Sequence, residues 1–152
     1  MAKFRYRMQN ILDVKIKLET QAKNDFAIAA AAVNEEEEKL RLLETRLQDQ
    51  TEYLRELQQG NLDFLKIKEA TQGIEAIKDM IEKQKLALKR ARDVLEERRI
   101  ALAEAMQEVK THEKLKEKEF QQFLADEAAR ESKEIDELVS YKFGAGSGDK
   151  KG

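Results

Sequence analysis

The chain of 152 residues contains no cysteine, no proline and no tryptophan, and its single histidine is His112. Without cysteine there is neither a disulfide nor a thiolate nucleophile, which fits a reducing compartment. Without proline, no residue removes a backbone donor from a long helix. One histidine makes neither a metal site nor a catalytic triad, so we interpret His112 as a tolerated polar residue of a helix interface.

The sequence also lacks the motifs of common enzymes. It has no glycine-rich phosphate loop and no H-E-x-x-H zinc motif, and its carboxylates fall on helix faces without a cleft. We therefore expect no enzyme activity, no cofactor and no metal. Acidic residues (31) nearly balance basic residues (29), which disfavours nucleic acid as a partner.

Long apolar runs are absent as well. The longest, Phe26–Val33, is too short to cross a bilayer, and the basic start of the chain is not followed by the apolar segment of a signal peptide. These features predict a soluble, cytoplasmic protein.

A heptad pattern, by contrast, is clearly present. Over Glu75–Leu138 the apolar residues recur at the 3.5-residue spacing of a coiled coil, with no glycine or proline to interrupt a helix. The main line of this seam consists of Ile81, Leu88, Leu95, Leu102 and Val109. The pattern predicts a second helix over about 74–141, which the first half of the chain must cover.

The first half predicts a partner helix over about 4–59. Its seam begins at Phe4, Met8 and Ile11, and the four-four-three spacing of Leu18, Ala22, Phe26 and Ala29 indicates a stutter. Helix two loses its frame between Val109 and Phe120, which we interpret as a matching stutter.

The two helices are joined by a predicted turn region over residues 60–73. Gly60 suits the end of helix one, Asn61 is placed to cap the segment after it, and Gly73 marks the entry to helix two. A turn centred between Lys66 and Ile67 makes the numbers of facing residues total about 133. The run Ala27–Ala32 then lies opposite Ala101, Ala103 and Ala105. The predicted fold class is all-α, a long two-helix antiparallel coiled-coil hairpin forming a single domain over residues 1–143.

The same register leaves one helix end without a partner. Phe4 falls opposite Ala129, so Ile135, Leu138 and Val139 are expected to form an unshared apolar stripe, which is typical of a docking surface. A frayed end or a homodimer contact are the alternatives. The Gly/Ser/Lys-rich tail over residues 144–152 is predicted to be disordered.

Two motifs resemble the FliJ family of flagellar type III export proteins. The first is Lys3-Phe4-Arg5-Tyr6-Arg7-Met8 followed by Ile11-Leu12. The second runs from Thr111 to Lys118 and continues with Glu127, Arg130, Lys133 and the pair Asp136-Glu137. Lys3, Arg5 and Arg7 between the aromatic residues also raise membrane or nucleic-acid contact, but basic flanks on an N-terminal seam explain them more simply.

The resemblance implies a cytoplasmic component of the flagellar export apparatus, peripheral at the cytoplasmic face of the inner membrane. It implies a stalk that binds the hexameric export ATPase, couples it to the transmembrane export gate and handles export chaperones. Carried onto this chain, the ATPase-docking residues are Arg130, Lys133, Ile135, Asp136, Glu137 and Leu138. The gate-docking residues are Leu43, Tyr53, Ile77 and Met80.

Two other functions remain open. A prefoldin-like holdase chaperone would bind unfolded chains through apolar residues of the turn, namely Leu62, Phe64, Leu65 and Ile67. A structural coiled-coil scaffold would assemble end to end. Whether the seam closes within one chain or between two chains is also open.

Overall fold

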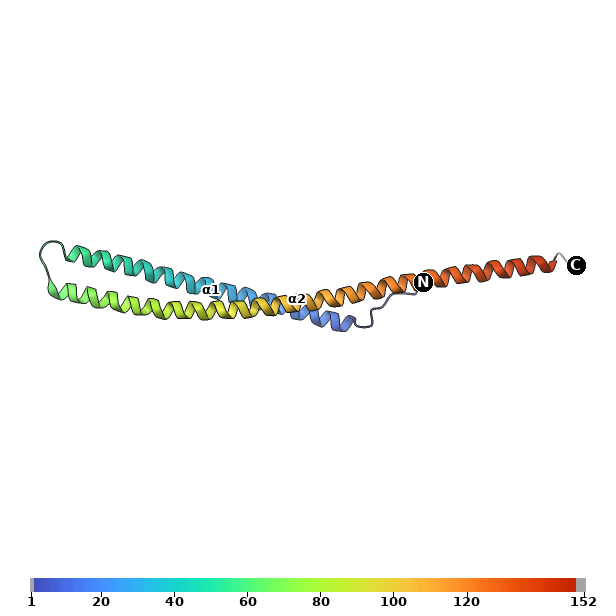
Figure 1. Ribbon diagram of the computed structural model, residues 1–152, viewed down its shortest axis with the longest axis horizontal. Helices are drawn as coiled ribbons and strands as arrows, with labels where there is room; N and C mark the ends of the chain where they lie inside the picture. Colours follow the sequence, from blue (N-terminus) through green and yellow to red (C-terminus); the bar gives the residue numbers. More distant parts are fainter. Residues whose placement is uncertain (1, 150–152) are drawn as a thin grey trace. The chain divides into compact units, whose positions relative to one another are not determined.

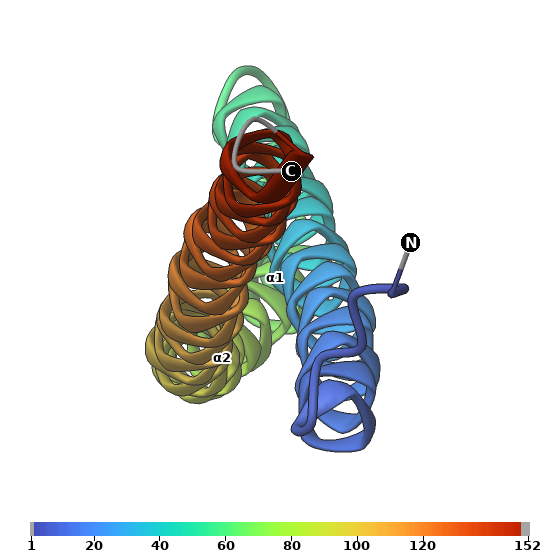
Figure 2. The same ribbon diagram turned by 90° about the vertical axis from the view of Figure 1, so that its right-hand side faces the viewer.

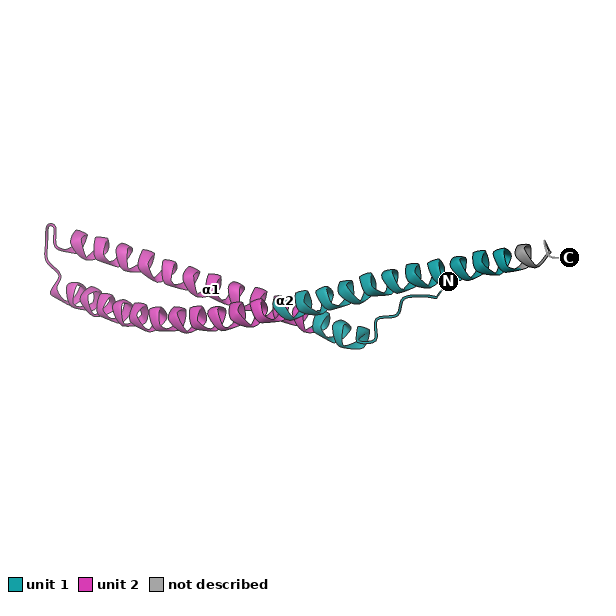
Figure 3. Ribbon diagram, turned by 45° about the vertical axis from the view of Figure 1, so that its right-hand side comes forward, with its two compact units in different colours: residues 1–17, 106–152 teal, residues 18–105 magenta. Residues whose placement is uncertain are grey.

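The computed structural model describes residues 2–149, with side chains to residue 144, and consists of two helices, α1 (Gln9–Leu57) and α2 (Phe64–Asp149) (Figure 1). The described residues form no strand. The chain divides into two compact units: unit 1 comprises Met1–Lys17 and Met106–Gly152, and unit 2 comprises Leu18–Ala105 (Figure 3). The single coiled-coil domain over residues 1–143 stays a prediction.

Unit 2 is a helical hairpin in which α1 and α2 run antiparallel and side by side (Figures 1 and 2). Its core is a single seam of small and β-branched residues together with one leucine: Ala29, Val33, Ala70, Ile74, Ile77, Ile81 and Leu88. The predicted antiparallel all-α hairpin is therefore confirmed. Each helix buries one stripe and leaves the rest of its surface to solvent, which explains why 39% of the residues are charged.

The seam of α1 in unit 2 is unbroken, so the stutter predicted near Leu18 is wrong. A line of buried and half-buried positions recurs in alternating steps of three and four: Glu19, Ala22, Phe26, Ala29, Val33, Glu36, Leu40, Leu43, Leu47, Gln50, Leu54 and Leu57. Asp25 and Ala30, each next to a residue of this line, are half-buried as well. Leu18 is exposed, and Glu19 takes the seam position. The apolar residues alone suggested a stutter because polar residues occupy several seam positions.

The turn lies at residues 58–63, earlier than predicted. Gly60 has φ +91°, a left-handed conformation that glycine adopts without steric cost after a helix. Asp63 caps α2: its carboxylate accepts hydrogen bonds from the N–H groups of Leu65 (3.1 Å) and Lys66 (3.3 Å). The predicted cap, Asn61, lies in the loop, and Gly73 lies inside α2 rather than at its entry.

The register of the hairpin follows from this turn. In unit 2, the Gln84 side chain reaches the backbone of Glu36, so the numbers of these facing residues total 120; the long side chains of Arg92 and Glu37, whose numbers total 129, form an ion pair across the helices. Both values lie below the predicted 133, and Ala103 is exposed rather than packed on the Ala27–Ala32 run. The Gln84 side chain donates to the backbone carbonyl of Glu36 (3.0 Å) and also to its carboxylate. This polar layer at two seam positions fixes the register, since another alignment would bury these groups unpaired.

Unit 1 contains the start of α1, the second half of α2 and the segment before α1, residues 2–8, that we call the N-terminal strap (Figure 3). The strap is extended over residues 2–6 and turns at Arg7 and Met8. Helix one begins at Gln9 rather than at the predicted Phe4. The strap alternates side chains as an extended chain does: Phe4 and Tyr6 face inward, whereas Lys3, Arg5 and Arg7 are exposed. Three cations would also be unfavourable in the first turn of a helix, beside its positive dipole end.

The far end of α2 differs from the prediction too. The helix continues to Asp149, where the sequence predicts a disordered tail from Gly144, and residues 150–152 of that tail lie outside the described residues. Within residues 2–149, neither helix offers an apolar stretch sufficient to cross a bilayer.

Candidate docking surfaces

The C-terminal part of α2 in unit 1 is exposed along all of its described side chains. Every side chain of residues 128–144, which we call the C-terminal arm, is exposed. Ile135 and Leu138 are 60% and 61% exposed, and Val139, Tyr141 and Phe143 are exposed with them. Isolated exposed apolar residues are common, but a contiguous stripe of them on one helix marks an interaction surface. The expected unshared stripe is thus present.

The arm presents different chemistry on its opposite sides. At 100° per residue, Ile135, Leu138 and Val139 lie on one side of the helix. Lys133 and Glu137 lie on the opposite side, so the docking residues implied by the family resemblance do not share one face. A partner that touches only one side of the arm would miss half of them.

The charges of the arm are only partly satisfied within the helix. Arg130 pairs with Glu127 one turn earlier, and this hydrogen bond, aided by the carboxylate charge, raises the pKa of the Arg130 guanidinium. Lys133, Asp136 and Glu137 form no ion pair with any other described residue. These three groups are therefore available to charges on another molecule.

The N-terminal strap packs onto α2 through its aromatic side chains. The Phe4 ring lies edge-on to Phe120, with centroids 5.1 Å apart, and tilted against Phe123 at 5.5 Å. Tyr6 is 5% exposed, and its buried hydroxyl has no hydrogen-bond partner among the described residues. The numbers of Phe4 and its partners total 124 and 127, so Phe4 does not face Ala129 as predicted.

The seam of α2 shifts beneath the strap. Half-buried and buried positions follow in the order Val109, His112, Lys116, Phe120, Phe123 and Glu127, with two successive steps of four after His112. This is the frame change predicted between Val109 and Phe120, and it occurs where the partner of α2 changes from a helix to an extended chain. The His112 Nδ1 atom is buried and, within residues 2–149, unpaired.

An ion pair joins the two helices of unit 1 just before this frame change. The Lys15 ammonium lies 2.8 Å from the Glu108 carboxylate. The hydrogen bond from Lys15 lowers the pKa of Glu108, with smaller contributions from the charges of Lys15 and of His112 one turn away.

The predicted gate-docking residues differ in their accessibility. Tyr53 and Met80 are exposed, and Leu43 is half-buried. Ile77, at 4% exposure, belongs to the core of unit 2. The role of these residues stays a prediction.

The turn of unit 2 also exposes apolar side chains. Leu62, Phe64 and Leu65 are all exposed, with Phe64 at 76%, whereas Ile67 is half-buried. The part of the chain that the structure describes has no group of three or more His, Asp or Glu side chains placed to hold a metal ion.

Two comparisons with known proteins found a match. The family described as flagellar FliJ protein matches residues 4–148. Among solved structures, a putative YscO homolog, CT670, from Chlamydia trachomatis is similar over 91% of this chain and 94% of that chain, with a TM-score of 0.69 and 22% identity. At this identity the likeness shows a shared fold. A search of curated proteins found no match.

Proposed function

The chain belongs to the flagellar FliJ protein family, and we propose that it is a coiled-coil stalk that couples the export ATPase to the export gate. Membership of this family makes it a component of the flagellar type III export apparatus. The finer role rests on the C-terminal arm, which would enter the ring of the hexameric ATPase.

The single observation that carries this role is the exposure of every side chain from residue 128 to residue 144. A helix that packed on one partner surface would carry one apolar stripe and a uniformly solvated back. The arm instead has an apolar side with Ile135 and Leu138, and free charges at Lys133 and Glu137 on the other side. A ring that surrounds the arm can contact both sides at once.

A stalk of this kind needs no catalytic group. If the arm binds one state of the ring more tightly than another, the difference in binding free energy biases the ring toward that state. Unit 2 would present the exposed residues Tyr53 and Met80 to the transmembrane gate, which places the protein at the cytoplasmic face of the membrane. Handling of export chaperones belongs to the same proposal.

The test is the double substitution Ile135→Asp/Leu138→Asp, with ATPase stimulation by the purified stalk as the readout. We expect stimulation to fall at least tenfold, because two carboxylates would be buried without partners in the complex. A matched control is Ile28→Asp/Leu42→Asp, which makes the same changes at two exposed positions of α1. Both variants should keep the helical circular dichroism signal, and equal loss of stimulation in both would contradict the proposal.

The exposed turn favours a second function, that of a holdase chaperone. Leu62, Phe64 and Leu65 form an apolar end to unit 2 that could bind unfolded chains. Replacing all three with serine leaves the Asp63 cap in place, so the hairpin should persist. Loss of aggregation suppression in this variant, together with no ATPase stimulation by the unmodified chain, would support the holdase over the stalk.

A further inference from the structure

The N-terminal strap carries positive charge that the rest of the described chain leaves unpaired. Lys3, Arg5 and Arg7 are exposed and have no carboxylate within ion-pair distance among residues 2–149. Cations elsewhere commonly pair with an acid one turn away, as Arg41 does with Glu38 and Arg99 with Glu96. An extended segment has no residue one turn away, so its cations remain available to another molecule.

The backbone of the strap is also unpaired. The N–H and C=O groups of Lys3, Phe4 and Arg5 form no hydrogen bond with any described residue. The first backbone bond of the segment is made by the Tyr6 carbonyl, which accepts from the N–H of Gln9 at 3.2 Å. An extended chain with free donors and acceptors is an edge to which another extended chain can pair.

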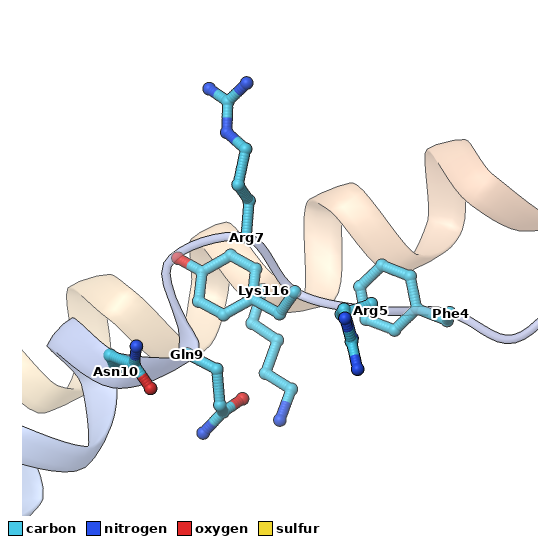
Figure 4. Close-up of a pocket in the computed structure, with 7 residues that line it drawn as sticks. Phe4, Arg5, Arg7, Gln9, Asn10 and Lys116 are labelled. Atoms are coloured by element: carbon cyan, nitrogen blue, oxygen red, sulfur yellow. The ribbon is translucent and has the colours of Figure 1, made fainter.

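A cleft adjoins this edge. It has a volume of about 620 Å³, and Arg5, Gln9, Asn10 and Lys116 are among the residues that line it. Figure 4 shows the side chains of Arg5, Gln9 and Lys116 extending to the same side of the strap, whereas Arg7 extends to the other. The Lys116 ammonium, like the Arg5 guanidinium, has no acidic partner in the described chain.

The first turn of α1 beside the cleft carries no negative charge, and Asp13, one turn further on, accepts a hydrogen bond from the Gln9 side chain (2.9 Å). The N–H of Asn10 has no acceptor within the described residues. A carboxylate in the cleft would be attracted by two cations and by the positive end of the helix dipole.

We propose that the strap binds an acidic, extended polypeptide segment of a partner, which pairs with the backbone of Lys3–Arg5 and places a carboxylate against Arg5 and Lys116. Alternate side chains of an extended peptide point to one side, so acids at every second position would face these cations. This surface is separate from the C-terminal arm, and its test does not depend on the ATPase.

The same residues argue against a membrane surface as the occupant. A membrane-binding segment turns its aromatic residues outward, but Phe4 packs against Phe120 of α2 and Tyr6 is buried. Glu113 and Glu117 border the neighbouring cleft beside Lys116. Glu119 and Asp126 border a third cleft with Lys3 and Arg5. These acids would repel a broad anionic plane, whereas a single extended chain can turn its acids toward Arg5 and Lys116 and its uncharged side chains away from them.

The proposal is tested with the full-length chain and a fluorescent peptide of four Glu-Thr repeats, by anisotropy at low salt. We expect saturable binding that weakens with added salt and is absent for the matched Gln-Thr peptide. Arg5→Ala/Lys116→Ala should weaken binding about tenfold, since two exposed charge pairs are removed. The control Lys17→Ala/Lys110→Ala removes the same charge elsewhere in unit 1 and should bind as the unmodified chain does.

Backbone pairing is tested separately, with a Glu-Thr peptide N-methylated at alternate residues. We expect its binding to be at least fivefold weaker, because the methyl groups remove donors from one edge. Equal binding of the methylated peptide, or equal effects of the two double substitutions, would overturn the proposal. Binding to vesicles that contain phosphatidylglycerol without binding to the peptide would overturn it in favour of a membrane.

Discussion

Ile77 was predicted to dock on the export gate, but the structure places its side chain in the core of unit 2. Its side chain is 4% exposed in the seam of unit 2. Ile77→Ala removes three carbon groups, which costs about 2.4 kcal/mol at about 0.8 kcal/mol per buried group. The higher helix propensity of alanine returns about 0.4 kcal/mol, and the open sides of a two-helix seam let neighbours close the gap. We expect the free energy of unfolding to fall by about 2 kcal/mol.

The matched comparison is Ile28→Ala at a position that is 69% exposed. About a third of the transfer energy is lost there, so after the gain in helix propensity the expected change is only about 0.3 kcal/mol. Urea unfolding followed at 222 nm measures both variants, and unchanged m values would show that the same surface is exposed on unfolding. If the two substitutions cost the same, Ile77 is not a core residue and the described seam of unit 2 is wrong.

The remaining predictions concern the turn and the ion pair of unit 1. Gly60→Ala should destabilise the chain by about 1 kcal/mol, because φ is +91°, whereas Gly73→Ala should stabilise it by up to about 1 kcal/mol, since Gly73 lies inside α2 with open space at its Cβ position. Urea unfolding of both variants checks this, and effects of the same sign would refute it. Lys15→Met should lower stability at neutral pH but not in acid, because Lys15 lowers the pKa of Glu108 in the folded chain. The ion pair stabilises the fold above the pKa of a glutamate in the unfolded chain, and this stabilisation is lost as the pH falls through the lowered pKa of Glu108. Unfolding curves across that range provide the measurement, and a difference that persists in strong acid would contradict the assignment.

The apolar periodicity was sufficient to predict the two helices and their antiparallel pairing. Ile74, Ile77, Ile81 and Leu88 recur at coiled-coil spacing, and a chain of this length has nothing else to cover such a seam. Their pattern could not fix the register, because a heptad seam looks similar after a shift of a few residues. The register depends on Gln84 and its contact with Glu36, which a search for apolar partners does not reveal.

The same limit explains the stutter that α1 does not have. Glu19 occupies a seam position between Lys15 and Ala22. Because Glu19 is acidic, the neighbouring Leu18 was predicted as the seam residue instead. Charged residues can occupy the seam of a narrow two-helix structure, because their ends reach solvent at the side. In a globular core the choice of the leucine would have been right.

The sequence of the strap does indicate an extended chain, but it was interpreted as part of a helix. Phe4 and Tyr6 alternate with Lys3, Arg5 and Arg7, which is the period of an extended chain and not of a helix. Phe4, Met8 and Ile11 also fit a helical seam, and the preference for one continuous helix decided between the two patterns. Only the packing distinguishes the extended from the helical pattern: the ring of Phe4, in an extended chain, packs against Phe120 and Phe123.

These corrections leave the interpretation of the arm unchanged, because it depends on where the partner of α2 ends and not on the register. With the predicted register, the partner would end opposite Ala129; with the observed contacts, Phe4 reaches Phe120 and Phe123, and no described side chain beyond Glu127 is even half-buried. The exposed stripe therefore begins slightly earlier than expected and retains Ile135 and Leu138. The position of an exposed docking surface on α2 follows from where the segment that covers α2 ends, and the contact of Phe4 with Phe120 and Phe123 defines that end.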